Sequence, residues 1–385
     1  MSTRYRLFAG VAPGLETLLA DELAAIGADV GKPRDGGVEI AGERELLWQV
    51  ARDSRLVETL RVRVGQPFVA QSFEELTDRV ARLALAAFLP RDPPELVTLR
   101  IESRKSRLYH ERAVAERVIA RLRERGLAAE EADAPGPNAP PPRPEHAPPT
   151  VWLRIVSDRV QVSVDAGGPA LFKRGYRRYV GEAPLRETLA AACLRAADYD
   201  GSQPLWDPFC GAATILLEAS AIASGLAPGA GRVFAFERWP THDAQAYAAW
   251  RESLPPPQAK APPPLLVGSD VDRRVLAAAR KNTGDLPGGS APITLVGRDF
   301  AAALDTVPRG AAVVTNPPYG HRLSDAGLKQ LFQRFGKTLQ RRTDLDPVVV
   351  LSGNPTFVQA SGLRWRQVAR TRNRGIGVSL LRLER

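Results

Sequence analysis

The residues with the clearest chemical potential form the stretch Asn316-Pro317-Pro318-Tyr319, which follows a short apolar run typical of a buried strand. Adjacent prolines restrict their own torsions and those of the preceding residue, so they keep the Asn316 amide and the nearby carbonyl pointing beyond the strand. Two fixed acceptors suit the two protons of a planar exocyclic amine. An attacking amine becomes tetrahedral and positive, so these acceptors favour its transition state. The stretch predicts amine chemistry, with Tyr319 stacking on the ring that carries the amine.

Three further groups of candidate residues follow apolar, strand-like runs. The first run ends at Asp207, where the small residues of 207–214 let the backbone approach a ligand closely, without the G-K-[ST] of a phosphate loop. Asp270 ends the next run and suits a pair of ribose hydroxyls. Asp299 and Phe300 suit the amine and ring of an adenine. Any one acid is as readily a helix cap, but three successive strand ends favour a nucleoside-like ligand.

The elements that must position these groups alternate between strand and helix from about residue 185 to the end. The expected strands are 204–208, 264–270, 292–299, 311–317, 346–353 and 376–384. Apolar strands alternating with helices predict a mostly parallel sheet that is covered on both faces. Ligands in such sheets bind beyond the carboxyl ends of the strands, which places all four groups in one crevice.

The N-terminal part of the chain predicts two smaller α+β units. Residues 4–60 alternate strand and helix signals, and a second unit follows up to residue 166. In this second unit we expect helices at 73–89 and 110–126, and strands at 96–103 and 151–166. Residues 132–150 are rich in proline, which forbids helix and central strand and predicts a surface insertion.

The segment 167–185, which connects these units to the C-terminal part, is basic and aromatic. Its core, 171–179, interleaves lysine and arginine with phenylalanine and tyrosine and contains no acid. Such a mixture suits phosphate contacts plus stacking on unpaired bases. A solvated linker with anchoring aromatic residues is the alternative.

The overall composition points in the same direction. The 385 residues carry a formal net charge of +10, mainly from arginine, which attracts phosphate-rich partners such as nucleic acid. An arginine-rich proteome is the alternative explanation. Cys193 and Cys210 lack metal-ligand or disulfide spacing, and the chain has neither an apolar leader nor an 18-residue apolar run. We expect a cytoplasmic monomer without metal or membrane contact.

In this order, the motifs DPFCGAAT, GSDVD, GRDF and TNPPYG resemble those of class I S-adenosylmethionine-dependent methyltransferases that modify exocyclic amines. The strings LFKRGYRRYVGEAPLRETLAA, FAFERWPTHD and NPPYGHRL are similar to a narrower group, the THUMP-domain RNA guanine-N2 methyltransferases, which include the bacterial RlmL. GLETLLADELAAIGA and SRLYHERAVAERV match the ferredoxin-like and THUMP units of that family. The resemblance implies a ferredoxin-like segment at 1–60, a THUMP RNA-binding domain at 61–166, a basic linker at 167–185 and a Rossmann-like α/β methyltransferase domain at 186–385.

The resemblance also implies roles for the residues at matching positions. The candidates for binding S-adenosylmethionine, ordered from its methionine side through ribose to adenine, are Asp207, Pro208, Cys210 and Gly211, then Asp270, then Asp299 and Phe300. The catalytic candidates, which would bind the target amine and base, are Asn316, Pro317, Pro318 and Tyr319. The candidates for RNA contact are Phe172, Lys173, Arg174 and Arg177.

Two features depart from the family pattern. The usual G-S-G-T turn has alanine at position 213, where a positive φ would add strain of about 1 kcal/mol. We therefore expect Ala213 to lie already in the start of the helix. The sequence also ends soon after the strand expected at 376–384, without the second methyltransferase that is fused in some relatives, so we expect a single methylation.

Together these features favour an enzyme that methylates N2 of a guanine flipped out of structured RNA, most readily 23S rRNA. The same chemistry on tRNA is one alternative. Methylation of adenine N6 or of a protein glutamine amide is another, because N-P-P-Y serves all three reactions. A catalytically impaired RNA-binding or assembly protein is the third, and Ala213 is the residue that supports it.

Overall fold

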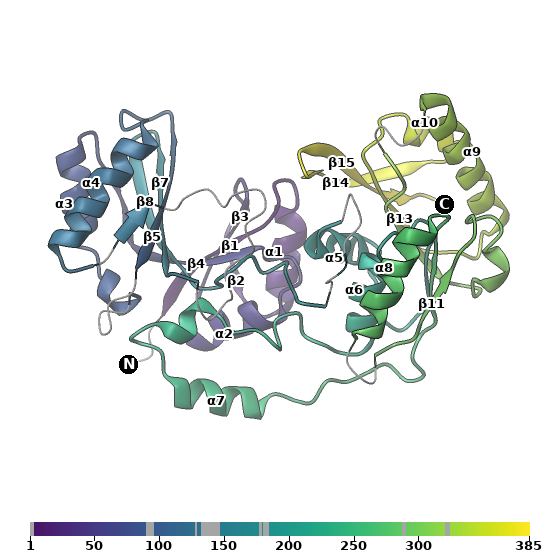
Figure 1. Ribbon diagram of the computed structural model, residues 1–385, viewed down its shortest axis with the longest axis horizontal. Helices are drawn as coiled ribbons and strands as arrows, with labels where there is room; N and C mark the ends of the chain where they lie inside the picture. The colour runs from purple at the N-terminus through teal and green to yellow at the C-terminus, as the bar shows by residue number, and fades with distance from the viewer. Residues whose placement is uncertain are drawn as a thin grey trace.

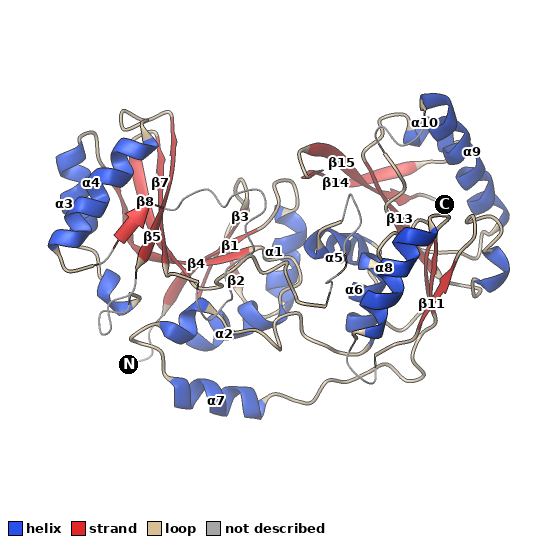
Figure 2. Ribbon diagram, in the orientation of Figure 1, coloured by secondary structure: helices blue, strands red, loops and turns tan. Residues whose placement is uncertain are grey.

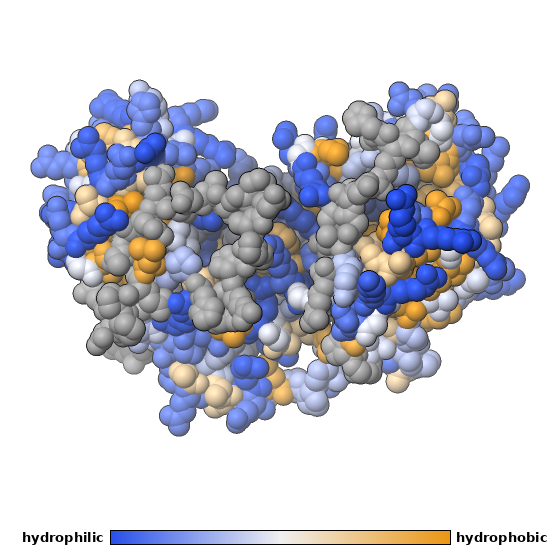
Figure 3. All heavy atoms as spheres, in the orientation of Figure 1, coloured by the Kyte–Doolittle hydropathy of each residue, from blue (hydrophilic) through white to orange (hydrophobic). Residues whose placement is uncertain are grey.

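The computed structural model describes residues 4–89, 96–127, 129–131, 147–176, 179, 185–286, 290–319 and 324–385. The described residues form two lobes that lie side by side (Figure 1), an N-terminal lobe up to residue 166 and a C-terminal lobe from residue 185. On the face shown in Figure 3, hydrophilic side chains lie along the outer margins of both lobes. Among the described helices, none combines the length and apolar character needed to cross a bilayer. Residues 132–146 of the expected proline-rich insertion lie outside the described residues.

Within the described residues, the N-terminal lobe contains an eight-stranded sheet in the order β2-β3-β1-β4-β8-β7-β5-β6. Its strands are β1 (Tyr5–Gly10), β2 (Asp29–Val30), β3 (Gly37–Gly42), β4 (Thr59–Val69), β5 (Val97–Arg104), β6 (Ala129–Glu131), β7 (Thr150–Val156) and β8 (Arg159–Asp165). Its helices are α1 (Glu16–Ala25), α2 (Arg44–Asp53), α3 (Phe73–Ala81) and α4 (Glu111–Glu124), with a 3-10 turn at Leu85–Ala87.

Strand β4 explains why the helices cover one face of this sheet. Its side chains alternate, so Leu60, Val62 and Val64 join the buried core beneath the helices, while Arg61 and Arg63 project from the other face. Figure 2 shows α3 and α4 together on one side of β5, β7 and β8. Because β4 pairs with both β1 and β8, the two units expected on either side of residue 60 share one continuous sheet.

The C-terminal lobe contains, within the described residues, a seven-stranded sheet in the order β11-β10-β9-β12-β13-β15-β14. Its strands are β9 (Leu205–Asp207), β10 (Leu266–Ser269), β11 (Ile293–Val296), β12 (Ala312–Thr315), β13 (Val348–Ser352), β14 (Trp365–Asn373) and β15 (Ile376–Leu383). Its helices are α5 (Glu187–Ala196), α6 (Thr214–Ala223), α7 (Ala244–Ser253), α8 (Arg273–Gly284), α9 (Asp325–Arg341) and α10 (Phe357–Ser361), with 3-10 turns at Ala235–Arg238 and Leu304–Thr306.

This sheet confirms the predicted α/β architecture. Strands β9 to β13 pair in parallel, and every residue of β9, β12 and β13 is buried, as expected for strands covered on both faces. The chain runs outward from β9 to β10 and β11 on one side, and then to β12 and β13 on the other. The point where the order reverses, at the carboxyl ends of β9 and β12, is where ligands bind in such sheets.

Two strand predictions differ from the structure. The expected strand 151–166 is a hairpin of β7 and β8, because Ser157 and Asp158 take positive φ angles of 49° and 63° and close a tight turn. Strand β14 was not predicted, since it carries exposed arginines at alternate positions instead of an apolar run. It pairs with β15, which lies antiparallel to β13.

The segment between α6 and β10 of the C-terminal lobe packs against the N-terminal lobe. It carries α7, which lies below α2 at the bottom of Figure 1. The Trp48 ring of α2 contacts Tyr247 and Trp250 of α7, with ring centroids 5.1 and 5.6 Å apart. Arg44 and Asp243 form an ion pair at 2.8 Å beside them. These contacts fix the C-terminal lobe against the helical face of the N-terminal lobe.

Candidate active site

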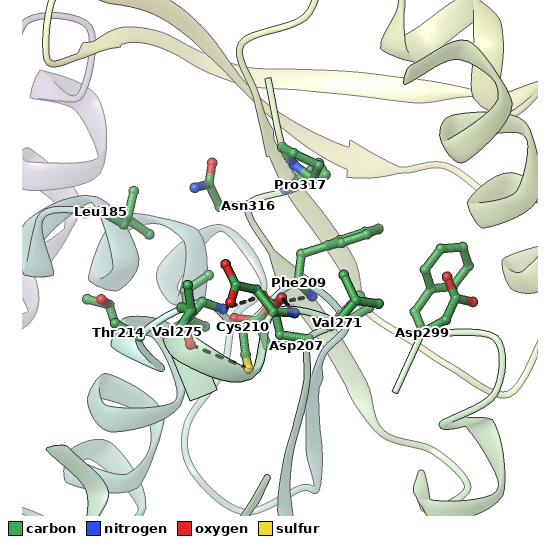
Figure 4. A pocket seen from close by; sticks show the side chains of 18 of the residues that line it. Leu185, Asp207, Phe209, Cys210, Thr214, Val271, Val275, Asp299, Asn316 and Pro317 are labelled. Carbon is green, nitrogen blue, oxygen red and sulfur yellow. Dashed lines mark hydrogen bonds between the residues drawn. The ribbon is translucent and has the colours of Figure 1, made fainter. Parts of the chain in front are cut away.

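The carboxyl ends of β9, β10, β11 and β12 enclose a cavity of about 400 Å³. Figure 4 shows Asn316 and Pro317 on one side of it, Asp207 and Cys210 at its centre, and Asp299 at the far end. The structure thus brings together all the predicted cofactor-binding and catalytic residues, which are Asp207, Pro208, Cys210, Gly211, Asp270, Asp299, Phe300, Asn316, Pro317, Pro318 and Tyr319. The strand-end rule therefore located the cavity from the sequence.

Asp207, at the end of β9, is 1% exposed. Its Oδ1 accepts hydrogen bonds from the Thr315 hydroxyl at 2.6 Å and from the Phe209 backbone N–H at 3.2 Å. Burial raises the pKa of this carboxyl to about 7, with a smaller contribution from Asp270 and against the two hydrogen bonds. A carboxylate held in this way in the cavity favours a cationic ligand group.

The turn after Asp207 is fixed by the next strand end. The Gly211 backbone N–H donates to Asp270 Oδ2 at 3.0 Å, and the Asp272 N–H donates to Asp270 Oδ1 at 2.9 Å. Asp272 in turn caps helix α8 through a hydrogen bond from the Arg274 N–H. Asp270 therefore ties two backbone turns together at the cavity wall.

The sequence suggested that Ala213 has a helical backbone at the start of α6, and the structure shows that it does not. It is the N-cap of α6 in the left-handed region, with φ 68° and ψ 25°. A residue with a Cβ is strained there by about 1 kcal/mol, which glycine would avoid. The side chain is fully buried, so its methyl packs in the core. The turn of this chain thus keeps the backbone path that the glycine of the family pattern permits.

At the third strand end, Asp299 is already engaged by the protein. Its Oδ1 accepts from Arg334 Nη2 at 2.6 Å and from the Ala301 N–H at 3.0 Å. The Phe300 ring is 2% exposed and packs against Phe335, with ring centroids 5.7 Å apart. Phe300 therefore forms part of the hydrophobic wall, and Arg334 sets the orientation of the carboxylate.

At the fourth strand end, Asn316 Oδ1 is buried and has no hydrogen-bond partner among the described residues. The Tyr319 hydroxyl accepts a hydrogen bond from Asn373 Nδ2 at 2.8 Å. Burial raises the pKa of Tyr319, and hydrogen bonds from Asn373 and Asn316 partly offset this shift. Tyr319 is therefore a neutral phenol at physiological pH, and Asn316, which lines the cavity, keeps an unpaired acceptor.

The candidate RNA-contact residues do not behave alike. The Arg186 guanidinium lies over the Phe172 ring at 5.2 Å, and Lys173 is exposed. The Arg174 side chain is 2% exposed and pairs with Glu218, which is fully buried. This corrects the expectation that Arg174 faces RNA, because its guanidinium belongs to the interior. Arg177 lies outside the described residues.

The buried charge of Glu218 also explains how the lobes are joined. Glu218 lies on α6 and pairs with Arg174 of the linker and with Arg55 of the N-terminal lobe. Arg174 also donates to the Arg55 carbonyl. A buried carboxylate is stable only with such partners, so this triad connects both lobes to the helix that follows the cavity turn.

Sequence reasoning missed several residues that shape the cavity. Thr315 and Arg334 orient two of the carboxylates, and Asn373 holds Tyr319. Asn282 of α8 donates from Nδ2 to the carbonyl groups of Tyr179 and Ala212, which links the linker to the cavity turn. Thr315 borders the N-P-P-Y stretch and could have been found from it. Nothing in the local sequence distinguishes Arg334, Asn373 or Asn282 from ordinary polar residues.

Comparison with known proteins points to one group. A family model described as RMKL-like, methyltransferase domain (UPF0020) matches residues 174–382, and a model of the RlmL ferredoxin-like domain matches residues 6–59. The chain is 30% identical to the Synechocystis protein slr0064, whose name gives RNA methylation as its inferred activity, over 98% of this chain and 96% of that protein.

Two further similarities extend over nearly the whole chain. The chain is 33% identical to the ribosomal RNA large subunit methyltransferase K/L of Methylococcus capsulatus over 93% of its own length and 48% of that enzyme, so it spans about half of the K/L relative. Among solved structures, SMU.472, which was crystallised in complex with SAH, superposes with a TM-score of 0.83 at 27% identity, with 100% of each chain covered.

Proposed function

The chain belongs to the family of RMKL-like methyltransferases, and from this premise we propose that it transfers a methyl group from S-adenosylmethionine to N2 of a guanine in RNA, with 23S rRNA as the substrate. The K/L relative is named for ribosomal RNA of the large subunit, and it shares both lobes with this chain. The net charge of +10 supports a phosphate-rich partner.

The residues of the cavity fit S-adenosylmethionine. A volume of about 400 Å³ suits a ligand of this size, since small-molecule pockets span roughly 300–1,000 Å³. Asp207, Asp270 and Asp299 present acceptors at three successive strand ends to a ligand with an ammonium, a ribose and an adenine amine. When bound, this cofactor supplies an electrophilic methyl group on a sulfonium. SMU.472, crystallised with SAH, supports the same assignment.

The observation that carries the proposal is the unpaired, buried Oδ1 of Asn316 at the cavity wall. A buried acceptor without a partner is unfavourable in the free protein, and a donor from the substrate relieves this. An exocyclic amine supplies such a donor, and its protons become more acidic as the nitrogen gains a fourth bond. Asn316 therefore binds the transition state more strongly than the planar amine. No strong base is required, because the amine releases its proton to solvent water only as the methyl arrives.

Tyr319 and the N-terminal lobe have complementary roles in this proposal. Tyr319 lines the cavity beside Asn316, so its ring can cover a flipped base whose amine meets Oδ1. Residues 1–60 act as the ferredoxin-like segment and residues 61–166 as the THUMP domain that holds the RNA. Lys173, which is exposed on the linker, contacts phosphate.

One observation favours a second function. The strained φ of 68° at Ala213 lies in the turn proposed to bind the cofactor. A protein that retains only RNA binding would tolerate strain in this turn, because it does not need to bind the cofactor. Against this reading, the carboxylates and Asn316 all remain in the cavity. Calorimetric titration with S-adenosylmethionine separates the two functions, because an impaired protein gives no heat up to millimolar cofactor.

Substrate and product are tested together by incubating the full chain with isotope-labelled S-adenosylmethionine and either unmodified 23S rRNA or tRNA. The nucleosides are then identified by mass spectrometry. The proposal expects labelled N2-methylguanosine in 23S rRNA. Label in tRNA alone would show that tRNA is the substrate. Labelled N6-methyladenosine would show that adenine N6 is the methylated atom, and the absence of label in both RNAs would reject the proposed function.

A further inference from the structure

Tyr319 is held by a residue that lies far from it in sequence. Asn373 is the last residue of β14, is 5% exposed, and donates from Nδ2 to the Tyr319 hydroxyl at 2.8 Å. Asn373 does not itself line the cavity that contains Tyr319. Any effect of Asn373 on a molecule in the cavity must therefore pass through Tyr319.

The Tyr319 ring is also confined on one face. A Cβ added at Gly353, the residue after β13, would lie 2.5 Å from Tyr319 Cδ2 and 2.8 Å from Cγ. These distances are shorter than real carbon contacts, so the ring lies directly against the glycine backbone and leaves no room for a side chain. With its hydroxyl bound and one face covered, the ring keeps a single plane.

The hydrogen bond also determines which amide atoms remain free. The Nδ2 of Asn373 is used by the Tyr319 hydroxyl. The Oδ1 atoms of both asparagines are buried without partners among the described residues. The hydroxyl therefore holds the Asn373 amide by its nitrogen, while the Oδ1 of Asn316 stays unpaired, as the proposed role of Asn316 requires.

We propose that Asn373 is a positioning residue: it fixes the plane of the Tyr319 ring in the cavity that Asn316 also lines. This inference rests on the proposed function, because it matters only if a base stacks on Tyr319 while its amine meets Asn316. Asn373 then affects the turnover of bound RNA and leaves cofactor affinity unchanged, since it is not among the residues that line the cavity.

The position of Asn373 is secured from the N-terminal lobe. Gly14, in the loop before α1, lies against β14 so closely that a Cβ there would be 1.8 Å from the Arg370 carbonyl oxygen. Arg370 precedes Asn373 by three residues on the same strand. The lobe proposed to hold RNA thus braces the strand that positions Tyr319.

A double-mutant cycle tests the inference, using Asn373→Ala, Tyr319→Phe and the double variant, with kcat and cofactor Kd measured for each. Each single change removes the same hydrogen bond, so we expect each to lower kcat about tenfold and the double variant to lose no more than Tyr319→Phe alone. Thr371→Val is the matched control, because Thr371 is buried on the same strand and its hydroxyl has no partner among the described residues. It should keep the kcat of the unmodified chain.

A fluorescence readout separates positioning from a merely structural role. RNA with 2-aminopurine at the target position carries its amine at the same ring carbon as guanine, and stacking on Tyr319 quenches it. We expect weaker quenching with Asn373→Ala and no change with Thr371→Val. Tyr319→Phe, which leaves Asn373 in place, tests the same hydrogen bond if Asn373→Ala does not fold.

The outcomes for this inference and for the proposed function are distinct. If the unmodified chain does not methylate RNA, the proposed function fails. If it does, and either Asn373→Ala or Tyr319→Phe keeps normal kcat and quenching, the inference alone is overturned. The inference is equally overturned if Asn373→Ala lowers kcat as much in the Tyr319→Phe background as in the unmodified chain, because Asn373 then acts independently of the hydroxyl.

Discussion

Cofactor binding is expected to depend on pH through Asp207. Burial raises the pKa of this carboxyl to about 7, and Asp270 adds to the shift. A cationic cofactor binds the ionised carboxylate, which forms about nine-tenths of the free protein at pH 8 and about one-tenth at pH 6. The affinity for S-adenosylmethionine should therefore fall about tenfold from pH 8 to pH 6.

The stability of the ligand-free protein should change in the opposite sense. The folded chain keeps the Asp207 proton up to about pH 7, whereas an unfolded aspartate loses it near pH 4. The folded state binds more protons between these values, so the free energy of unfolding falls as the pH rises from about 4 to 7. Asp165, whose pKa burial also raises to about 7, contributes in the same direction.

Isothermal titration with S-adenosylmethionine between pH 6 and 8 at constant ionic strength measures the effect. The amine of the cofactor itself titrates near pH 8, so Asp207→Asn serves as the control that retains this background and lacks the carboxylate. We expect the tenfold change only in the unmodified chain. An affinity that is equal at both pH values, or the same dependence in Asp207→Asn, would refute the reasoning.

Three further changes have defined outcomes. Asn316→Ala should lower the rate of methyl transfer by about 10²–10³-fold with unchanged cofactor affinity in a titration, and ordinary turnover would contradict its role. Glu218→Gln leaves the buried Arg174 and the partly buried Arg55 facing a neutral amide, so urea unfolding should show a loss of about 3–5 kcal/mol in the free energy of unfolding; the control Glu116→Gln, in an exposed pair, should lose less than about 1 kcal/mol. Gly14→Ala combines a φ of 93° with the collision at the Arg370 carbonyl, so it should lower both Tm and turnover, and a variant with normal values would show that the loop and β14 are not in contact.

The part of the fold that could be predicted from sequence is the part with regular apolar periodicity. Strands such as β12 and β13 are continuous apolar runs because helices cover both faces, and their ends gave the cavity. Strand β14 was not predicted, because its arginine-rich sequence has no apolar run. It is a strand because it pairs with β15. The continuity of the N-terminal sheet was not predicted for a similar reason, since it depends on the pairing of β4 with both β1 and β8.

The candidate site shows the same limit at the level of single residues. Motif order brought Asp207 and Asn316 to one cavity, because each lies at a strand end. The burial of Arg174 could not be read from a basic, aromatic segment, since its partner Glu218 lies 44 residues further along the chain, on α6 of the C-terminal lobe. The left-handed backbone at Ala213 is set by the turn and the packed methyl, which local helix propensity does not report.

The most direct test of the account is a map of N2-methylguanosine in the rRNA and tRNA of a strain that lacks this gene. The account predicts that one 23S rRNA fragment loses the modification, that the intact gene restores it, and that the Asn316→Ala gene does not. A profile that is unchanged in both RNA pools, or full restoration by Asn316→Ala, would contradict the claim that this side chain binds the amine of a guanine during methyl transfer.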